Sequence, residues 1–166
     1  MHREKLLRRI RALTWVFIIG LVLSGATALP LKSELDALAR VIKPEQALSD
    51  SGAPGPAWAV WLSKVHAAVA STRAAYPFLF YGTDWLAFGH FVIALAFIGA
   101  LRDPVRNSWL FDFGLLACAL VIPYALLAGA VRGIPFWWRL IDCSFGLFGA
   151  IPIWLCRRWT AELQLK

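Results

Sequence analysis

Long runs of apolar residues, separated by shorter polar segments, dominate this chain. Four of them cover about 13–31, 85–101, 109–131 and 140–156, and each is bounded by charged residues or by tryptophan. A hydrocarbon core about 30 Å thick requires about 20 helical residues at a rise of about 1.5 Å each, and the four runs match that length. The pattern predicts an all-α polytopic membrane protein, built as a bundle of four transmembrane helices.

The first run permits a second interpretation. It follows a basic start, and Ala26-Thr27-Ala28 has the form of a signal-peptide cleavage site. The apolar stretch nevertheless continues through Leu29-Pro30-Leu31, which gives it the length of a true span. We therefore favour an uncleaved anchor, whereas cleavage after Ala28 would leave three spans.

The 32–83 segment between the first two spans is predicted to be external. Ser33-Glu34-Leu35-Asp36 has the form of a capping box and predicts a short helix that Lys43-Pro44 ends. The turn-forming residues 49–56 predict a loop. From about 56 to 76, apolar residues recur at helical spacing and predict an amphipathic helix. Such a helix suits the outer headgroup layer, or its apolar face packs on the bundle or on a partner protein.

Composition agrees with this interpretation. The 166 residues are 60% hydrophobic and 16% charged, whereas an ordinary soluble domain is about a quarter charged. The four spans and their connections use most of the length. We therefore expect a single integral membrane domain over 1–166.

The basic residues are unevenly distributed, although the net charge of +7 alone would also suit nucleic-acid binding. Ten of the 17 basic residues fall in three short segments: Arg3, Lys5, Arg8, Arg9 and Arg11; Arg102 and Arg106; Arg157, Arg158 and Lys166. This asymmetry follows the positive-inside rule and predicts that both termini are cytoplasmic, in the inner membrane if the source is bacterial. The expected partners are the lipid bilayer and a membrane protein or a second copy of the chain, not nucleic acid.

Three polar residues within the spans form the candidate site. His90, Asp142 and Tyr124 are each expected roughly 6–10 Å below the outer interface, from their distance along the helix. An aspartate at the centre of a span costs about 2.5–3.5 kcal/mol on insertion scales, so it is expected to face the bundle and find a partner. The rim of such a pocket would be formed by Arg132, Arg139 and Asp84.

The neighbours of Asp142 predict its direction. Gly146, Gly149 and Ala150 follow it as a stripe of small residues, which lets two helices approach closely. Asp142 would then point inward, where His90 could pair with it. Two structural alternatives compete: His90 only bonds a neighbouring helix, or Asp142 forms a local ion pair with Arg139, one turn before it.

Asp112 lies near the opposite, cytoplasmic interface. There Arg106, or the basic tail at Arg157 and Arg158, could neutralise its charge. We interpret it as an interfacial anchor rather than as part of a site.

Cofactor motifs are weak. Haem would need two facing axial ligands, for which His66 and His90 are the available pair. The three cysteines form no C-x-x-C pair, and no zinc or nucleotide motif occurs in the sequence. We predict neither a metal nor a cofactor.

Three functions remain open from the sequence. The first is a non-enzymatic accessory or structural subunit of a membrane assembly. The second is an intramembrane binder or enzyme for a lipid or small apolar molecule. In that enzyme His90 would act as base or as hydrogen-bond donor, Asp142 would orient it and Tyr124 would be a further donor. The third is a haem protein.

Overall fold

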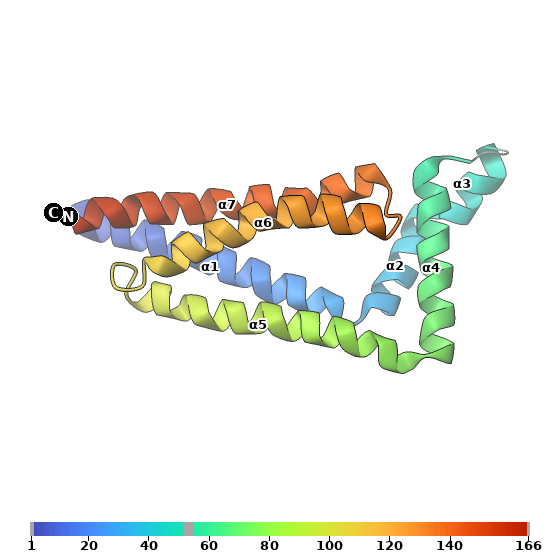
Figure 1. Cartoon of the computed structure of the whole chain (residues 1–166), viewed down its shortest axis with the longest axis horizontal. Helices are drawn as coiled ribbons and strands as arrows, with labels where there is room; N and C mark the ends of the chain where they lie inside the picture. Colours follow the sequence, from blue (N-terminus) through green and yellow to red (C-terminus); the bar gives the residue numbers. More distant parts are fainter. Residues whose placement is uncertain (1, 52–54, 166) are drawn as a thin grey trace. The chain divides into compact units, whose positions relative to one another are not determined.

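The computed structural model describes residues 2–51 and 55–165, apart from the side chains of residues 50 and 51. Helices make up nearly all of this part of the chain (Figure 1). In chain order they are α1 (His2–Ala28), α2 (Leu31–Ile42), α3 (Pro44–Ser51), α4 (Ala57–Ala75), the 3-10 helix η1 (Pro77–Phe80), α5 (Tyr81–Arg102), α6 (Trp109–Val131) and α7 (Phe136–Gln164).

Four of these helices are long and apolar enough to cross a membrane. They are α1, α5 together with η1, α6 and α7, and they contain the four apolar runs of the sequence. The predicted all-α bundle of four transmembrane helices is therefore confirmed. Both α1 and α7 extend well beyond their apolar runs into residues rich in charge, because their polar ends remain helical.

Several predicted boundaries need correction. Asp103-Pro104 has the form of a helix start, with the aspartate as N-cap and the proline at the first helical position, but the third long helix begins at Trp109. The residues before it form a turn: Asp103 Oδ1 accepts the Arg106 N–H at 3.0 Å, and Asn107 Nδ2 donates to the carbonyls of Gly99 and Asp103 at 3.0 Å each. Asp103 therefore caps a turn, not a helix.

The external segment also differs in detail. Helix α2 begins at Leu31 and not at Ser33, and it ends where predicted, at Lys43-Pro44. Lys43 adopts the left-handed conformation (φ 49°), and its N–H bonds the Ala39 carbonyl. The loop expected over 49–56 starts later, because 49–51 are the last residues of α3, and 52–54 lie outside the described residues.

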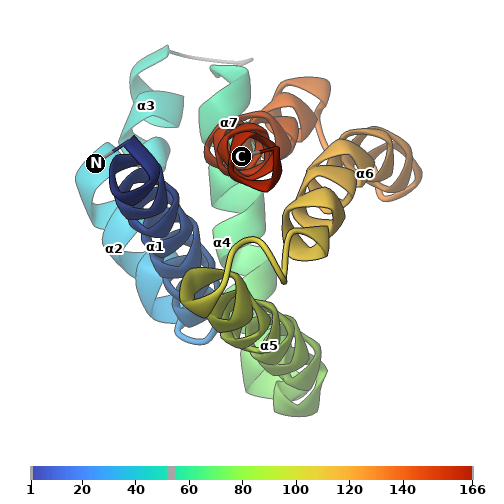
Figure 2. The ribbon, with the colours of Figure 1, turned by 90° about the vertical axis from the view of Figure 1, so that its left-hand side faces the viewer.

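The chain divides into two compact units. Unit 1 contains the residues up to Val22 and those from Phe91 onward, and unit 2 contains Leu23–His90. In unit 1 the N- and C-terminal ends of the chain lie at the same end (Figure 2). The core of this unit consists of apolar side chains from α1, α5, α6 and α7, among which Ile10, Phe97, Phe111 and Ile153 are fully buried.

Glycines allow the closest helix contact in unit 1, between α6 and α7. A Cβ on Gly146 would lie 2.5 Å from the backbone carbonyl oxygen of Cys118, and one on Gly149 would lie 3.2 Å from its Sγ. The small-residue stripe after Asp142 is therefore the interhelical face that the sequence predicted.

Candidate functional site

A cluster of three polar side chains in unit 2 is the best-defined ionic arrangement outside the spans. The ammonium of Lys32 lies 2.6 Å from Asp36 Oδ2, and His66 Nε2 lies 2.8 Å from Asp36 Oδ1. Lys32 and Asp36 are one turn apart on α2, so both face the same way. His66 comes from the middle of α4. The cluster therefore joins two helices that are separated in the sequence.

The electrostatics of this cluster are set by its cations. The hydrogen bond from Lys32, and then the one from His66, hold the pKa of the Asp36 carboxyl below its ordinary value of 3.8. An ionised carboxylate only accepts hydrogen bonds, so the proton on His66 must be on Nε2. In neutral His66 this leaves Nδ1 as the acceptor.

The half-buried side of α2 carries Lys32 and Asp36 of the cluster together with the apolar Leu31, Leu35 and Ala39. The half-buried residues of α2 include Lys32, Leu35 and Asp36, whereas Leu38, Val41 and Ile42 are exposed, Val41 by 81%. In the sequence, Leu35, Leu38 and Ile42 line one side of this helix, but the structure half-buries Leu35 and exposes Leu38 and Ile42. An ordinary surface helix buries its apolar face, so α2 exposes residues that a soluble helix would cover.

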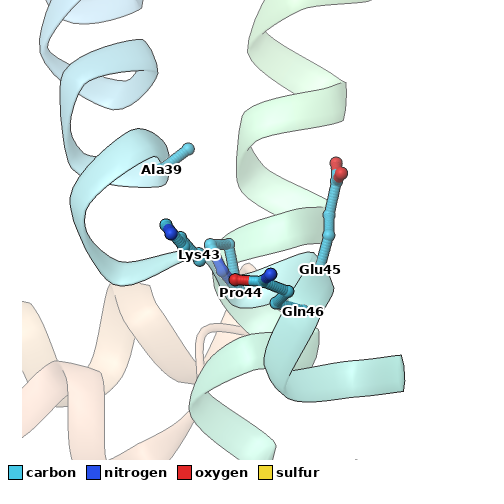
Figure 3. A pocket seen from close by; sticks show the side chains of 5 residues that line it. All are labelled: Ala39, Lys43, Pro44, Glu45 and Gln46. Atoms are coloured by element: carbon cyan, nitrogen blue, oxygen red, sulfur yellow. The ribbon is translucent and has the colours of Figure 1, made fainter. Parts of the chain in front are cut away.

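A hollow of about 280 Å³ lies where α2 passes into α3 (Figure 3). It is lined by Ala39, Lys43, Pro44, Glu45 and Gln46. The left-handed Lys43 forms part of its wall, and such a backbone is uncommon for a residue other than glycine. The lining brings one ammonium and one carboxylate to a turn between two short helices.

The predicted pocket residue Arg139 has a structural role at the end of α6. Its Nε donates to the Ile134 carbonyl at 3.0 Å and its Nη1 to the Leu126 carbonyl at 3.2 Å. A Cβ on Gly129 would lie 2.5 Å from Arg139 Cδ, so the side chain crosses that glycine. Arg139 therefore ties the last turns of α6 to the connection that leads into α7.

Asp142 is half-buried on α7, beside the glycine stripe. The local ion pair with Arg139, one of the alternatives, is not formed. Within the described part of unit 1, the structure gives Asp142 no hydrogen bond or ion pair. Its carboxylate is thus without a partner in its own unit.

The other predicted site residues are more open. Tyr124 is 75% exposed on α6, and Arg132 and Asp84 are also exposed. His90 donates from Nδ1 to the Leu86 carbonyl of its own helix at 2.8 Å. His90 belongs to unit 2, and Asp142 and Tyr124 belong to unit 1. The pairing of His90 with Asp142 stays a prediction.

Asp112 forms an ion pair with the basic tail, which was one of its two predicted partners: Arg157 Nε lies 2.6 Å from Asp112 Oδ1.

Haem and metal ligation can be compared with the actual histidine contacts. His66 uses Nε2 for Asp36, so an axial bond from that nitrogen would break the cluster. His2 is 2.8 Å from Glu162. In the described ranges, 2–51 and 55–165, no group of three or more His, Cys, Asp or Glu side chains could hold a metal ion.

Sequence reasoning missed Lys32 and Asp36. Their i, i+4 spacing was a visible signal for a salt bridge on a helix. The third member, His66, lies thirty residues further along, and nothing local to it indicates the pairing.

No family model, curated protein or solved structure shows significant similarity to this chain. The fold by itself defines the class: a four-span, all-α membrane protein with a small helical unit between its first two spans.

Proposed function

We propose that the protein is a non-enzymatic accessory subunit of a membrane assembly, which binds a partner membrane protein through α2. One observation carries this proposal. Helix α2 is joined to α4 by the ionic cluster and presents Leu38, Val41 and Ile42 outward. Exposed apolar residues at i, i+3 and i+4 are the pattern with which one helix recognises another.

The Lys32–Asp36–His66 cluster also supports the proposal that α2 binds a partner. Lys32 and His66 both direct hydrogen bonds to Asp36. In this arrangement the cluster fixes the rotation of α2 about its own axis. That rotation decides which residues α2 presents to a partner.

Photocrosslinking in native membranes tests the proposal. A benzophenone amino acid at Val41 should give a discrete protein adduct, whereas the same group at Ser33, also exposed on α2, should not. Asp36→Asn should weaken the Val41 adduct by loosening the rotation of α2. Lipid adducts alone at Val41, or equal protein adducts at both positions, would contradict the proposal.

We further infer that the basic ends are cytoplasmic and that the protein lies in the inner membrane. The three basic segments named above support this orientation by the positive-inside rule. A reporter fused after the last residue should be active only if it is a cytoplasmic reporter. Activity of a reporter that works outside the cytoplasm would reverse the orientation.

A second candidate function has one observation in its favour. Asp142 lies in a membrane-spanning helix without a partner in its own unit, and such a carboxylate is usually paired or functional. In this alternative Asp142 and Tyr124 of unit 1 bind a lipid or small apolar molecule. Asp142→Asn would then abolish binding or turnover while the thermal stability stays near that of the wild type. A joint loss of expression and stability would indicate a structural role.

A further inference from the structure

Tryptophan and arginine alternate along two helices at one end of unit 1. On α1, Arg11 is four residues before Trp15 and Arg8 is seven before it, so the three side chains share a face. On α7, Arg158 is four residues after Trp154, and its guanidinium lies 5.7 Å from the Trp154 ring centroid. All five side chains are exposed.

Side-chain contacts bring these two series to the same level. Cys156 Sγ lies 3.6 Å from the Ile10 carbonyl oxygen and 3.8 Å from Thr14 Oγ1. Trp154 is two residues from Cys156 on one side, and Arg158 is two residues from it on the other. Because α1 and α7 run in opposite directions (Figure 1), Trp154 is level with Trp15, and Arg158 is level with Arg11.

Arg11 and Arg158 therefore lie one helical turn, about 6 Å, closer to the chain ends than the tryptophans, and Arg8 lies about one turn further still. Tryptophan rings prefer the level of the headgroups, and guanidinium groups one turn further out meet the phosphates there. Four side chains are buried at this end of α1 and α7: Leu6, Ile10, Thr160 and Leu163. They pack the polar ends of the two helices together.

Three arginines at this end are available to bind a phosphate: Arg8, Arg11 and Arg158. Arg157 is bound by Asp112, and Arg9 lies over the Trp159 ring at 5.8 Å. In the described part of the chain, by contrast, Arg8, Arg11 and Arg158 form no ion pair with a carboxylate. A guanidinium fork suits a phosphate with two hydrogen bonds.

We propose that this end of unit 1 binds anionic phospholipid headgroups at two positions of the same level, one on the outer face of α1 and one on the outer face of α7. Arg8, Arg11 and Arg158 bind the phosphates, and Trp15 and Trp154 set the depth of the helices. The proposal is independent of the partner binding proposed for α2. It concerns phospholipids with a net negative charge, because a zwitterionic headgroup carries its own ammonium against the phosphate.

Native mass spectrometry of the full chain in detergent micelles tests the proposal, with phosphatidylglycerol and phosphatidylcholine supplied in equal amounts. The wild type should retain phosphatidylglycerol in preference to phosphatidylcholine. Arg11→Gln with Arg158→Gln should lower that preference by about fivefold per arginine. Arg11→Lys with Arg158→Lys should retain most of it, which separates loss of charge from loss of fold.

The matched control is Arg40→Gln with Lys64→Gln, which removes the same charge from exposed positions of unit 2. This control should leave the preference unchanged. An equal loss in both glutamine pairs would overturn the proposal, because net charge alone would then explain retention. Displacement of the lipid by inorganic phosphate, or by an RNA oligonucleotide at equal phosphate concentration, would also overturn it.

Discussion

In unit 1 the fully buried side chains include Phe97, Phe111 and Ile153, whereas in the described part of unit 2 the buried hydrophobic side chains are those of Ala59 and Ala87. Large apolar side chains and close glycine contacts hold the helices of unit 1. In unit 2 an aspartate between a lysine and a histidine joins α2 to α4. Apolar packing depends on shape and is insensitive to pH, whereas an ionic joint depends on the protonation of its members.

The largest effect is expected from an added methyl group at the α6–α7 contact. Gly146→Ala places a Cβ 2.5 Å from the Cys118 carbonyl oxygen, so the two helices must separate. We expect a destabilisation of about 1–3 kcal/mol, the usual cost of overpacking. Denaturant unfolding in micelles measures it.

The matched control is Gly20→Ala on α1, where a Cβ would meet nothing within 4 Å. There the gain in helix propensity should stabilise the protein by about 0.5–1 kcal/mol. Equal effects at the two glycines would contradict a close contact at Gly146.

The second change removes the charge at the centre of the unit 2 joint. Asp36→Asn leaves Lys32 and His66 without their shared carboxylate, so hydrogen exchange of the α2 amides should accelerate. The effect on global unfolding should be smaller than that of Gly146→Ala, because little apolar surface depends on the joint. Glu34→Gln, an exposed acid on the same helix, should leave the exchange of α2 unchanged. Faster exchange in both variants would argue against a specific joint.

The smallest effect is expected from the ion pair of unit 1. Arg157 and Asp112 have side-chain exposures of 34% and 54%, and such pairs contribute about 0.2–1 kcal/mol. Arg157→Gln should therefore lower the free energy of unfolding by less than about 1 kcal/mol. A loss as large as that of Gly146→Ala would mean that the stability of unit 1 also depends on an ion pair.

The spans could be predicted because a bilayer imposes a fixed length on any helix that crosses it. The partner of Asp112 could be predicted for a similar reason, since the interface brings Arg157 to its level. The stripe of Gly146 and Gly149 identified a helix contact because only small side chains allow it. Each of these features is set by a local pattern together with one external constraint.

The rotation of a helix about its own axis could not be predicted, and neither could contacts between residues far apart in the sequence. Helix α6 is apolar on all sides, so its sequence did not show that Tyr124 would be 75% exposed. The Lys32–Asp36–His66 cluster depends on how α2 and α4 meet, which no local pattern in the sequence indicates. Arg139 was assigned to a pocket rim because the sequence does not show the Ile134 and Leu126 carbonyls to which its guanidinium donates.

Hydrogen exchange as a function of pH, corrected for the intrinsic rates, tests the difference between the units most directly. The pKa of Asp36 is lowered from 3.8 on folding, so its stabilisation is fully present above 3.8 and is lost as the pH falls through the folded-state value. Protection of α2 should therefore stay constant from neutral pH down to about 4 and decrease below it, while α6 and α7 keep theirs. A parallel decrease in all these helices, or none in α2, would contradict the account.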